Sequence, residues 1–443
     1  MVDEYIQRDR LRMRHIGVVC ALALVGSIAM TTTVLVLTLW VAGFPHVALP
    51  GKEGLPLERL IDIIKLSFAA VAGIGGVIAL VLGYRRQKVF EAAERRAEGA
   101  EQREATKLFN ERFTIASDKL GHESPAVVLA GVHALARLAD DAPTGGLRQT
   151  VIDVLCAYLR MPYTPPPGND ATTYQRLAYA GYREVRHTII RLISARLREG
   201  VPISWQGHDF DLTGVVFDGG DFSDAIFSGG EVSFRDAVFR SGRIHFERSA
   251  FLGCTADFKG ASFEGAQVDF RGSQFRDCLL DLHGARFSAG EVCFDQCVFL
   301  GGEMHANECV FSGAEVGFNQ AIFSADAISF YGAEFSAGKV GFWGTLFAGR
   351  SGFRYARFTG AHVTFYNAQF SSGEVDFEAA RFLSGLVGFR GAEFTGSKVD
   401  FRFSRFLGGA LDLGQVSGHV PPLLPSDTLP GVTMPTSPRE TSG

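Results

Sequence analysis

Phenylalanine recurs at fixed intervals from Phe210 to Leu413, and this repeat constrains the fold more than any other feature of the chain. One step that should span seven residues spans six, from Phe347 to Phe353, which marks a one-residue deletion near Arg350. A fixed short period indicates a repeat architecture in which each unit packs on its neighbours. The steps of the ladder alternate between seven and five residues, as at Phe227, Phe234, Phe239, Phe246, Phe251, Phe258, Phe263, Phe270 and Phe275.

The repeat unit reads as short strands separated by tight corners, as in FRGAEFTGSKVD (389–400). In extended chain alternate residues share a face, so each Phe and the small residue two before it point inward. The residue between them, often charged as at Asp269, Arg286 and Asp376, points outward. Glycine after each triplet permits a corner with positive φ. Phe and Gly at this spacing form no 3.6-residue stripe, so the pattern predicts a β-solenoid and not a helix.

Five-residue units such as ARFSA (285–289) and VDFEA (375–379) carry a resemblance to a known family. The repeat resembles the pentapeptide-repeat family, which implies a right-handed, quadrilateral β-helix with the central ring inside. Here two extra residues follow every second unit, which gives twelve residues in place of ten. A twelve-residue coil could not enclose two rings, so we predict that two such repeats form each coil. About eight coils at ~4.8 Å each would form a rod of roughly 40 Å over residues 205–416.

Two apolar stretches before the repeat predict a transmembrane hairpin. Residues 16–44 carry no charge and 63–84 form a second apolar run, with a short external loop at 45–62. A cleavable signal peptide does not fit, because the first run is too long and lacks a clean cleavage site. Arginines flank both runs on the side away from the loop, so the positive-inside rule puts the N-terminus (1–15), the C-terminus and the repeat domain in the cytoplasm. The predicted location is the plasma membrane, with the lipid bilayer contacted through both runs.

The chain between the second apolar run and the repeat is predicted to be helical. Residues 85–119 are charged and favour a stalk helix. Amphipathic patterns over 125–140, 148–160 and 172–199 predict a small α-helical module within residues 120–200, with a proline-rich break at 163–170. Trp205 is expected to seal the first coil. The fold class is therefore mainly β, and residues 417–443, rich in Pro, Ser and Thr, are expected to be disordered.

No motif in the sequence identifies a reaction. There is no phosphate-binding loop of the Walker type, no His-Glu-x-x-His and no spacing that would bring together a nucleophile, a histidine and a carboxylate. The spacing of Cys293 and Cys297 does not fit a zinc site, and the cysteines of the repeat are expected to be reduced, buried small residues. We therefore expect no enzyme: no catalytic, cofactor-binding or metal-binding residues, no cofactor and no small-molecule substrate.

Coils made of two repeats place two rows of outward side chains on the solenoid as candidate partner-binding sites. The first, the apolar row, consists of Val298, Ile322 and Leu346, and exposed apolar rows often mark interaction sites. The second, the arginine row, consists of Arg357, Arg381 and Arg405. The sequence leaves two interpretations open. The rows dock a protein partner and an anionic surface, or they pack along the sheet and pair with acids such as Asp376, Asp400 and Glu393.

The sequence leaves three functions open. The first is a membrane-anchored protein-interaction scaffold with an unknown protein partner, because regular rods without a catalytic constellation commonly serve this role. The second follows from the resemblance, since some pentapeptide-repeat proteins mimic duplex DNA and bind DNA gyrase. Residues 205–349 carry a net charge of −11, which fits mimicry, whereas residues 350–413 carry +2, which does not. The third is a sensor or transport accessory protein. Direct nucleic-acid binding is not expected.

Overall fold

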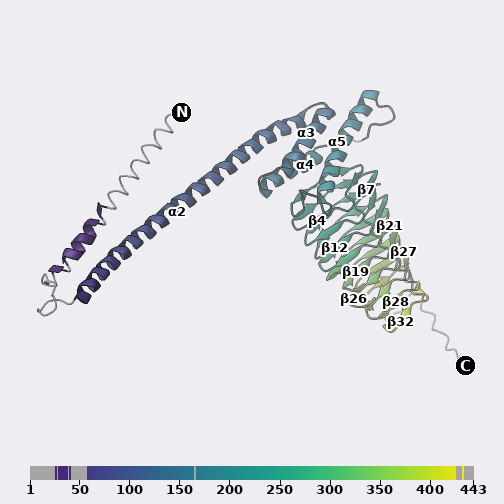
Figure 1. Ribbon diagram of the computed structural model, residues 1–443. Coiled ribbons are helices and arrows are strands. Elements are labelled where there is room, and N and C mark those ends of the chain that lie inside the picture. Colours follow the sequence, from purple (N-terminus) through teal and green to yellow (C-terminus); the bar gives the residue numbers. More distant parts are fainter. Residues whose placement is uncertain are drawn as a thin grey trace. The chain divides into compact units, whose positions relative to one another are not determined.

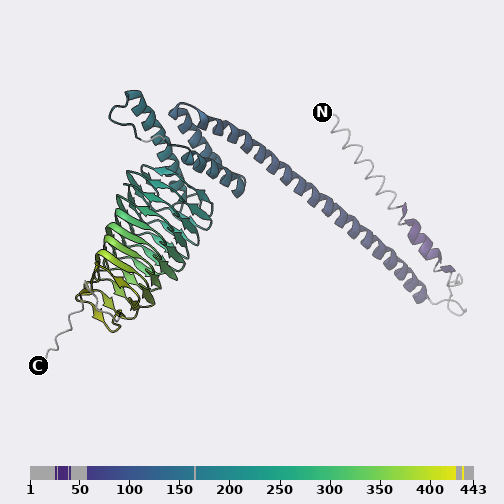
Figure 2. The same ribbon diagram turned by 180° about the vertical axis from the view of Figure 1, so that it is seen from behind.

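The computed structural model describes residues 25–26, 28–37, 39–40, 57–163, 166–425 and 432–433. It divides into two compact units, Met1–Glu104 and Ala105–Gly443, each described by itself below. Figures 1 and 2 show the second unit as a helical module followed by a β-solenoid. The helices are α2 (Leu57–Asp118), the 3-10 turn η1 (Lys119–Gly121), α3 (Pro125–Asp140), α4 (Gly145–Arg160) and α5 (Thr173–Leu197).

The predicted transmembrane hairpin is wrong. Within the described residues, no helix is both long enough and apolar enough to cross a membrane. The predicted second membrane helix, 63–84, is the early part of α2, a single helix of 62 residues that continues into the charged stretch predicted as a stalk. Its apolar run, 66–82, falls short of the about 20 predominantly apolar residues that a bilayer requires, and Ser and Gly residues interrupt it. Of the predicted first membrane helix, 16–44, the structure describes residues 25–26, 28–37 and 39–40, which are helical, and the rest lies outside the described residues.

The three helices of the module begin where their sequences provide caps. Pro125 occupies the first turn of α3, where its missing N–H is not needed. The Thr144 side chain accepts a hydrogen bond from the Leu147 backbone N–H at the start of α4. Thr172 and Gln175 form a capping box at the start of α5. These helices confirm the predicted amphipathic segments, and their apolar faces form one core that includes Val132, Leu135, Leu155, Leu159, Ile189 and Ile193.

The solenoid contains four short strands in each regular coil, and parallel pairing between coils joins them into three sheets. The first sheet contains β1 (Phe210–Asp211), β5 (Glu231–Ser233), β9 (Thr255–Asp257), β13 (Leu279–Asp281), β17 (Glu303–His305), β20 (Ala327–Ser329), β23 (Ser351–Gly352), β26 (Glu374–Asp376) and β29 (Lys398–Asp400). The third sheet contains β4 (Ile226–Ser228), β8 (Ala250–Leu252), β12 (Gln274–Arg276), β16 (Val298–Leu300), β19 (Ile322–Ser324), β22 (Leu346–Phe347), β25 (Gln369–Phe370), β28 (Glu393–Phe394) and β32 (Ser417–Gly418).

The second sheet covers two sides of the solenoid, because strands such as β18 pair with strands from both sides of the preceding coil. One run of this sheet contains β2 (Val216–Phe217), β6 (Val238–Phe239), β10 (Ser262–Phe263), β14 (Arg286–Phe287), β18 (Val310–Gly317), β21 (Glu334–Gly341), β24 (Arg357–Thr364), β27 (Arg381–Gly388), β31 (Ala410–Asp412) and β33 (Val432–Thr433). The remaining strands are β3 (Gly220–Asp221), β7 (Arg243–His245), β11 (Gln267–Asp269), β15 (Glu291–Cys293) and β30 (Arg405–Phe406).

The pairing register confirms that two repeats form one coil, since Phe251 pairs with Phe275 and Phe275 with Phe299. The deletion near Arg350 shortens one coil, so Leu346 pairs with Gln369, one residue earlier than in the regular register. The first and third sheets have nine strands each, which indicates about nine coils where the sequence predicted about eight. The predicted range, 205–416, already holds nearly nine coils in the 24-residue register of Phe251 and Phe275, and β32 lies just beyond it.

Stacked phenylalanine rings fill the interior of the solenoid. Phe263, Phe287 and Phe311 form one column, with ring centroids 4.6 and 4.7 Å apart and planes tilted by only 3° and 6°. Rings of adjacent columns meet edge to face, as Phe330 and Phe342 do at 87°. Each buried ring contributes on the order of 1.5–3 kcal/mol. The inward Phe positions therefore hold the coils together, as the sequence predicted.

Trp205 lies between α5 and the first strand of the solenoid and binds residues of the helical module. Its side chain is fully buried, and its indole N–H donates to Asp140 Oδ1 at 3.0 Å. Arg196 of α5 binds both oxygens of the same carboxylate at 2.7 and 2.6 Å, and its guanidinium lies over the Trp205 ring. These contacts all lie in the helical module, so the role of Trp205 in sealing the first coil stays a prediction.

Replacing a stacked ring should destabilise the solenoid far more than replacing an exposed one. Phe342 is fully buried between Phe318 and Phe365, so Phe342→Ala leaves a cavity and should lower the free energy of unfolding by ~3–5 kcal/mol. Phe403 is 66% exposed, so Phe403→Ala should change the free energy of unfolding by less than about 0.5 kcal/mol. Denaturant unfolding followed by circular dichroism measures both. Equal losses in the two variants would contradict the assignment of inward and outward positions.

Candidate functional site

Asp218 lies where the helical module meets the first coil, and it binds side chains from two segments of that module. Its Oδ2 accepts hydrogen bonds from Tyr163 OH at 2.9 Å, Tyr179 OH at 2.8 Å and Arg183 Nε at 3.0 Å. Its Oδ1 lies 2.9 Å from His187 Nε2. Tyr179, Arg183 and His187 project from α5, whereas Tyr163 follows α4. One buried carboxylate thus fixes the positions of two tyrosine rings.

The electrostatics of this contact favour the ionised form of Asp218. Burial alone would raise the pKa of this carboxyl, but hydrogen bonds from His187, Tyr179 and Tyr163 outweigh it and hold the pKa well below the ordinary value of 3.8. Burial and the hydrogen bonds to Tyr179 and Asp218 raise the pKa of Tyr163 well above 10.0. The tyrosine hydroxyls therefore remain donors to a carboxylate across the physiological pH range.

Two glycines beside Asp218 make room for α5. A Cβ atom on Gly219 would stand 3.0 Å from His187 Cε1, and one on Gly220 would stand 3.2 Å from Ile190 Cδ1. Gly219 also adopts a φ of +136°, which favours glycine. The first coil is two residues shorter here than a regular coil, since Val216 pairs with Val238. The Asp-Gly-Gly sequence thus lets the helix approach the backbone of the coil.

The same tyrosines form one wall of a large cleft, here called the tyrosine groove. Its volume is about 1010 Å³, and its walls come from η1 and the turn after it, from the end of α4 with the proline-rich loop, and from the first half of α5. Figure 1 shows that this half of α5 projects beyond the solenoid. The groove is lined by five tyrosines and three prolines: Tyr158, Tyr163, Tyr174, Tyr179, Tyr182, Pro162, Pro166 and Pro167.

Part of the groove wall is rigid. The rings of Tyr163 and Tyr179 stack with their centroids 5.7 Å apart. Arg186 lies under Tyr163, with its guanidinium carbon 4.3 Å from the ring centroid, and donates hydrogen bonds to the carbonyls of Leu159 and Val216. Fixed aromatic rings with polar tips bind apolar, extended ligands at low entropic cost.

Sequence reasoning did not find this groove. Its walls come from segments separated by tens of residues, and no periodic pattern joins them. The available signal was compositional, because tyrosines are concentrated between Tyr158 and Tyr182 on both sides of the Pro165-Pro166-Pro167 run. Tyrosine at this density beside consecutive prolines indicates a recognition surface more than a structural core.

The structure brings the predicted apolar row together on the third sheet. Val298 pairs with Ile322, and Ile322 pairs with Leu346, in adjacent coils. Ile322 is 39% exposed, while Val298 and Leu346 are half-buried. The row ends at Gln274 on one side and Gln369 on the other. It therefore forms a narrow, partly covered apolar strip.

The arginine row lies on the second sheet and is fully outward. Arg357 pairs with Arg381, and Arg381 with Arg405, so the three side chains stand one strand spacing, ~4.8 Å, apart. All three are exposed. Exposed apolar and aromatic side chains occur within two residues of these arginines in the sequence: Tyr355, Leu383, Phe403 and Leu407. The arginine row and these four side chains are together called the arginine patch.

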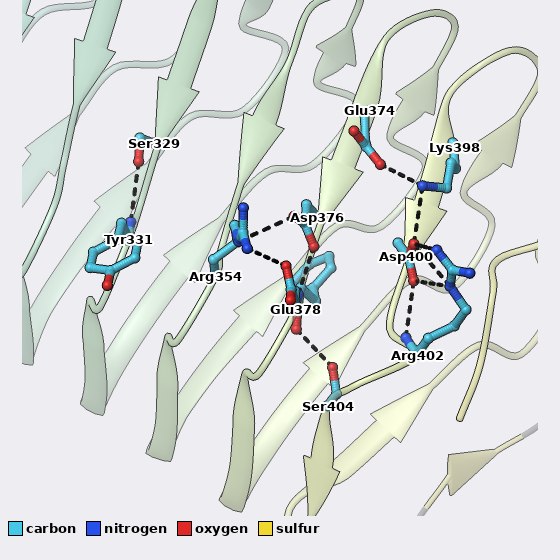
Figure 3. A network of polar contacts seen from close by, with 11 residues as sticks. Ser329, Tyr331, Arg354, Glu374, Asp376, Glu378, Lys398, Asp400, Arg402 and Ser404 are labelled. Atoms are coloured by element: carbon cyan, nitrogen blue, oxygen red, sulfur yellow. Dashed lines mark hydrogen bonds and ion pairs between the residues drawn. The ribbon is translucent and has the colours of Figure 1, made fainter. Parts of the chain in front are cut away.

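Acids that could have neutralised the arginine row bind other cations, as Figure 3 shows. Asp376 and Glu378 pair with Arg354, and Asp400 pairs with Lys398 at 3.1 Å and Arg402 at 2.6 Å. The third predicted acid, Glu393, pairs in register with Gln369 on the third sheet instead. No ion pair between described residues includes an arginine of the row.

The cysteines of the repeat are buried, free thiols, as predicted. Cys297 and Cys309 occupy the small inward position, and each donates to a backbone carbonyl of the preceding coil at 3.0 Å. Over the part of the chain that the structure describes, no group of three or more His, Cys, Asp or Glu is arranged to hold a metal ion.

A scan against protein-family models, a search of curated proteins and a search of solved structures each returned no match.

Removing the charge of Asp218 should loosen the attachment of α5 to the first coil. Asp218→Asn should lower the free energy of unfolding by about 2–4 kcal/mol at pH 7, because Arg183 and His187 lose a buried anionic partner. A depressed pKa in the folded state stabilises the protein above the ordinary Asp value, and this contribution is lost as the pH falls through the folded pKa. The gap in free energy of unfolding between the parent and Asp218→Asn should therefore be constant from pH 7 to about pH 5 and shrink below about pH 4.

Denaturant unfolding of both proteins between pH 7 and pH 3 measures this gap. Asp326→Asn serves as the matched control, because Asp326 is exposed and its side chain has no partner among the described residues. A gap that stays constant down to pH 3, or an equal loss in the control, would contradict the role assigned to the Asp218 carboxylate.

Proposed function

We propose that this protein is a protein-interaction scaffold of the pentapeptide-repeat type. The parallel β-solenoid with stacked phenylalanines supports the scaffold role, because solenoids present extended regular surfaces whose outward residues do not affect the core. Units of five residues with a central buried ring, such as 285–289, support the assignment to pentapeptide repeats. The extra two residues after every second unit lengthen the coil without interrupting the ring columns.

The arginine patch is the observation that carries this proposal. Two unit charges 4 Å apart repel by about 1 kcal/mol in water and about 4 kcal/mol at the effective dielectric of a protein surface. Three guanidinium groups in consecutive strands, without carboxylate partners among the described residues, therefore remain mutually repulsive. An anionic ligand relieves this repulsion, so the patch favours a partner that presents several carboxylates in a row.

The flanking side chains favour a protein partner. Phe403 and Leu407 are 66% and 65% exposed beside Arg405, and Tyr355 is half exposed beside Arg357. Arginine together with aromatic side chains is the composition enriched at protein interfaces and at their energetic centres. The partner that fits this surface is an acidic protein segment with apolar residues between its carboxylates.

Neutralising the arginine row should abolish capture of such a partner. The full-length triple variant Arg357→Gln, Arg381→Gln, Arg405→Gln should fold as the parent does and lose specific partners in affinity capture followed by mass spectrometry. Capture by the parent should weaken steeply between 50 and 300 mM salt, roughly the range over which screening shortens to a few ångströms. Acidic proteins should be enriched among those lost.

A matched control removes the same net charge elsewhere. Arg240, Arg248 and Arg271 are paired with Glu264, Asp224 and Asp269, so replacing these three arginines with Gln changes total charge equally without touching the patch. Retention of all partners by the patch variant, or equal loss in the control, would rule out the arginine patch as the docking surface.

A further inference from the structure

The tyrosine groove has the composition of a site for proline-rich peptide. Polyproline II segments dock into grooves lined by aromatic rings, because the extended ligand is already ordered and presents flat pyrrolidine faces. In this groove Tyr163 and Tyr179 are fixed by Asp218, whereas Tyr174 is 81% exposed along the same wall. The volume of about 1010 Å³ accommodates a short extended peptide and exceeds what one side chain would fill.

The rim of the groove adds a preference for positive charge. Glu123 lies in the wall after η1 and Asp170 in the wall before α5, and both residues are exposed. Arg186, the one arginine among the described residues of the lining, is buried and has two backbone carbonyls as partners. A proline-rich ligand that carries a basic residue therefore complements the site.

This chain contains such a segment near its C-terminal residue. Residues 434–443 read MPTSPRETSG, with Pro435 and Pro438 in the P-x-x-P spacing and Arg439 directly after the second proline. This spacing places both prolines on one side of a polyproline II helix, which has three residues per turn. The segment combines the proline spacing with one basic residue, Arg439, which Glu440 follows.

The segment cannot fill the groove of its own chain. Thr433 is the last described residue and pairs with Asp412 in the last coils, whereas the groove adjoins the first coil through Asp218. Nine strands at ~4.8 Å separate these ends by roughly 40 Å, and residues 434–438 extend over at most ~17 Å. We propose that the tyrosine groove binds the Pro435–Arg439 segment of a second copy of this protein.

The contact is heterologous, because the groove of one copy binds the tail of the next and leaves a free groove and a free tail at the ends. Such contacts build rings or open chains instead of closed pairs. The proposal is independent of the arginine patch, which lies on another surface and would stay available in each copy.

A labelled synthetic peptide tests the binding step. A fluorescent peptide of residues 432–443 is titrated with the full-length Pro435→Ala, Pro438→Ala variant, whose own tails no longer compete, and anisotropy reports binding. Tyr174→Ala added to this variant should weaken binding about tenfold, the size expected for truncating one aromatic anchor. Tyr331→Ala, an exposed tyrosine on the solenoid outside the arginine patch, is the matched control and should leave binding unchanged. A peptide with both prolines replaced by Ala should not bind.

Sedimentation velocity tests the assembly step with the parent protein. Association should increase with concentration and should be lost in both the Pro435→Ala, Pro438→Ala variant and the Tyr174→Ala variant. The proposal is overturned if the peptide fails to bind, if it binds equally well after Tyr174→Ala, or if the parent shows no association above the measured dissociation constant. Binding of an oligoproline peptide but not of residues 432–443 would also overturn it, because the groove would then recognise the proline-rich segment of a different protein.

Discussion

Stacking of phenylalanine rings between coils is the interaction on which the solenoid depends. Columns such as Phe246, Phe270 and Phe294, with centroids 4.6 and 4.7 Å apart, require that every coil return to the same register. A ring out of register would leave a void in its own column and a clash in the next, since interiors are packed to near-crystalline density. The length of the coil, the parallel ladders and the rows of outward side chains all follow from this requirement.

The sequence predicted this part of the fold because the information is local and repeated. Alternation within each triplet assigned residues such as Asp269 and Arg286 to the surface, and ring spacing determined which outward residues share a row. The pairing of Val298 with Ile322 and of Arg381 with Arg405 follows from the same count. The spacing could not predict whether the arginines of a row have ion-pair partners, because Arg354, Lys398 and Arg402 compete for the acids nearby.

The tyrosine groove and the contact at Asp218 could not be predicted, since both depend on how α5 meets the first coil. Tyr163 and Asp218 are 55 residues apart, and nothing in either local pattern indicates the other. The membrane hairpin was wrong for a different reason. The run 66–82 carries no charge, but Ser67, Gly73 and Gly76 reduce its hydrophobicity, and it forms part of a helix that continues to Asp118.

Residues beyond the last full coil pair with its open edge. Leu423 forms a bridge with Asp400, and Val432 pairs with Leu411, within a stretch that composition marked as disordered. An uncovered terminal coil would offer rows of free N–H and C=O groups to any passing strand, which is how parallel stacks grow into fibres. These few residues cap the last coil, and α5 packs against the first coil at the opposite end. The stack of coils therefore has a defined length. Copies of the protein can meet through side chains without pairing their sheets.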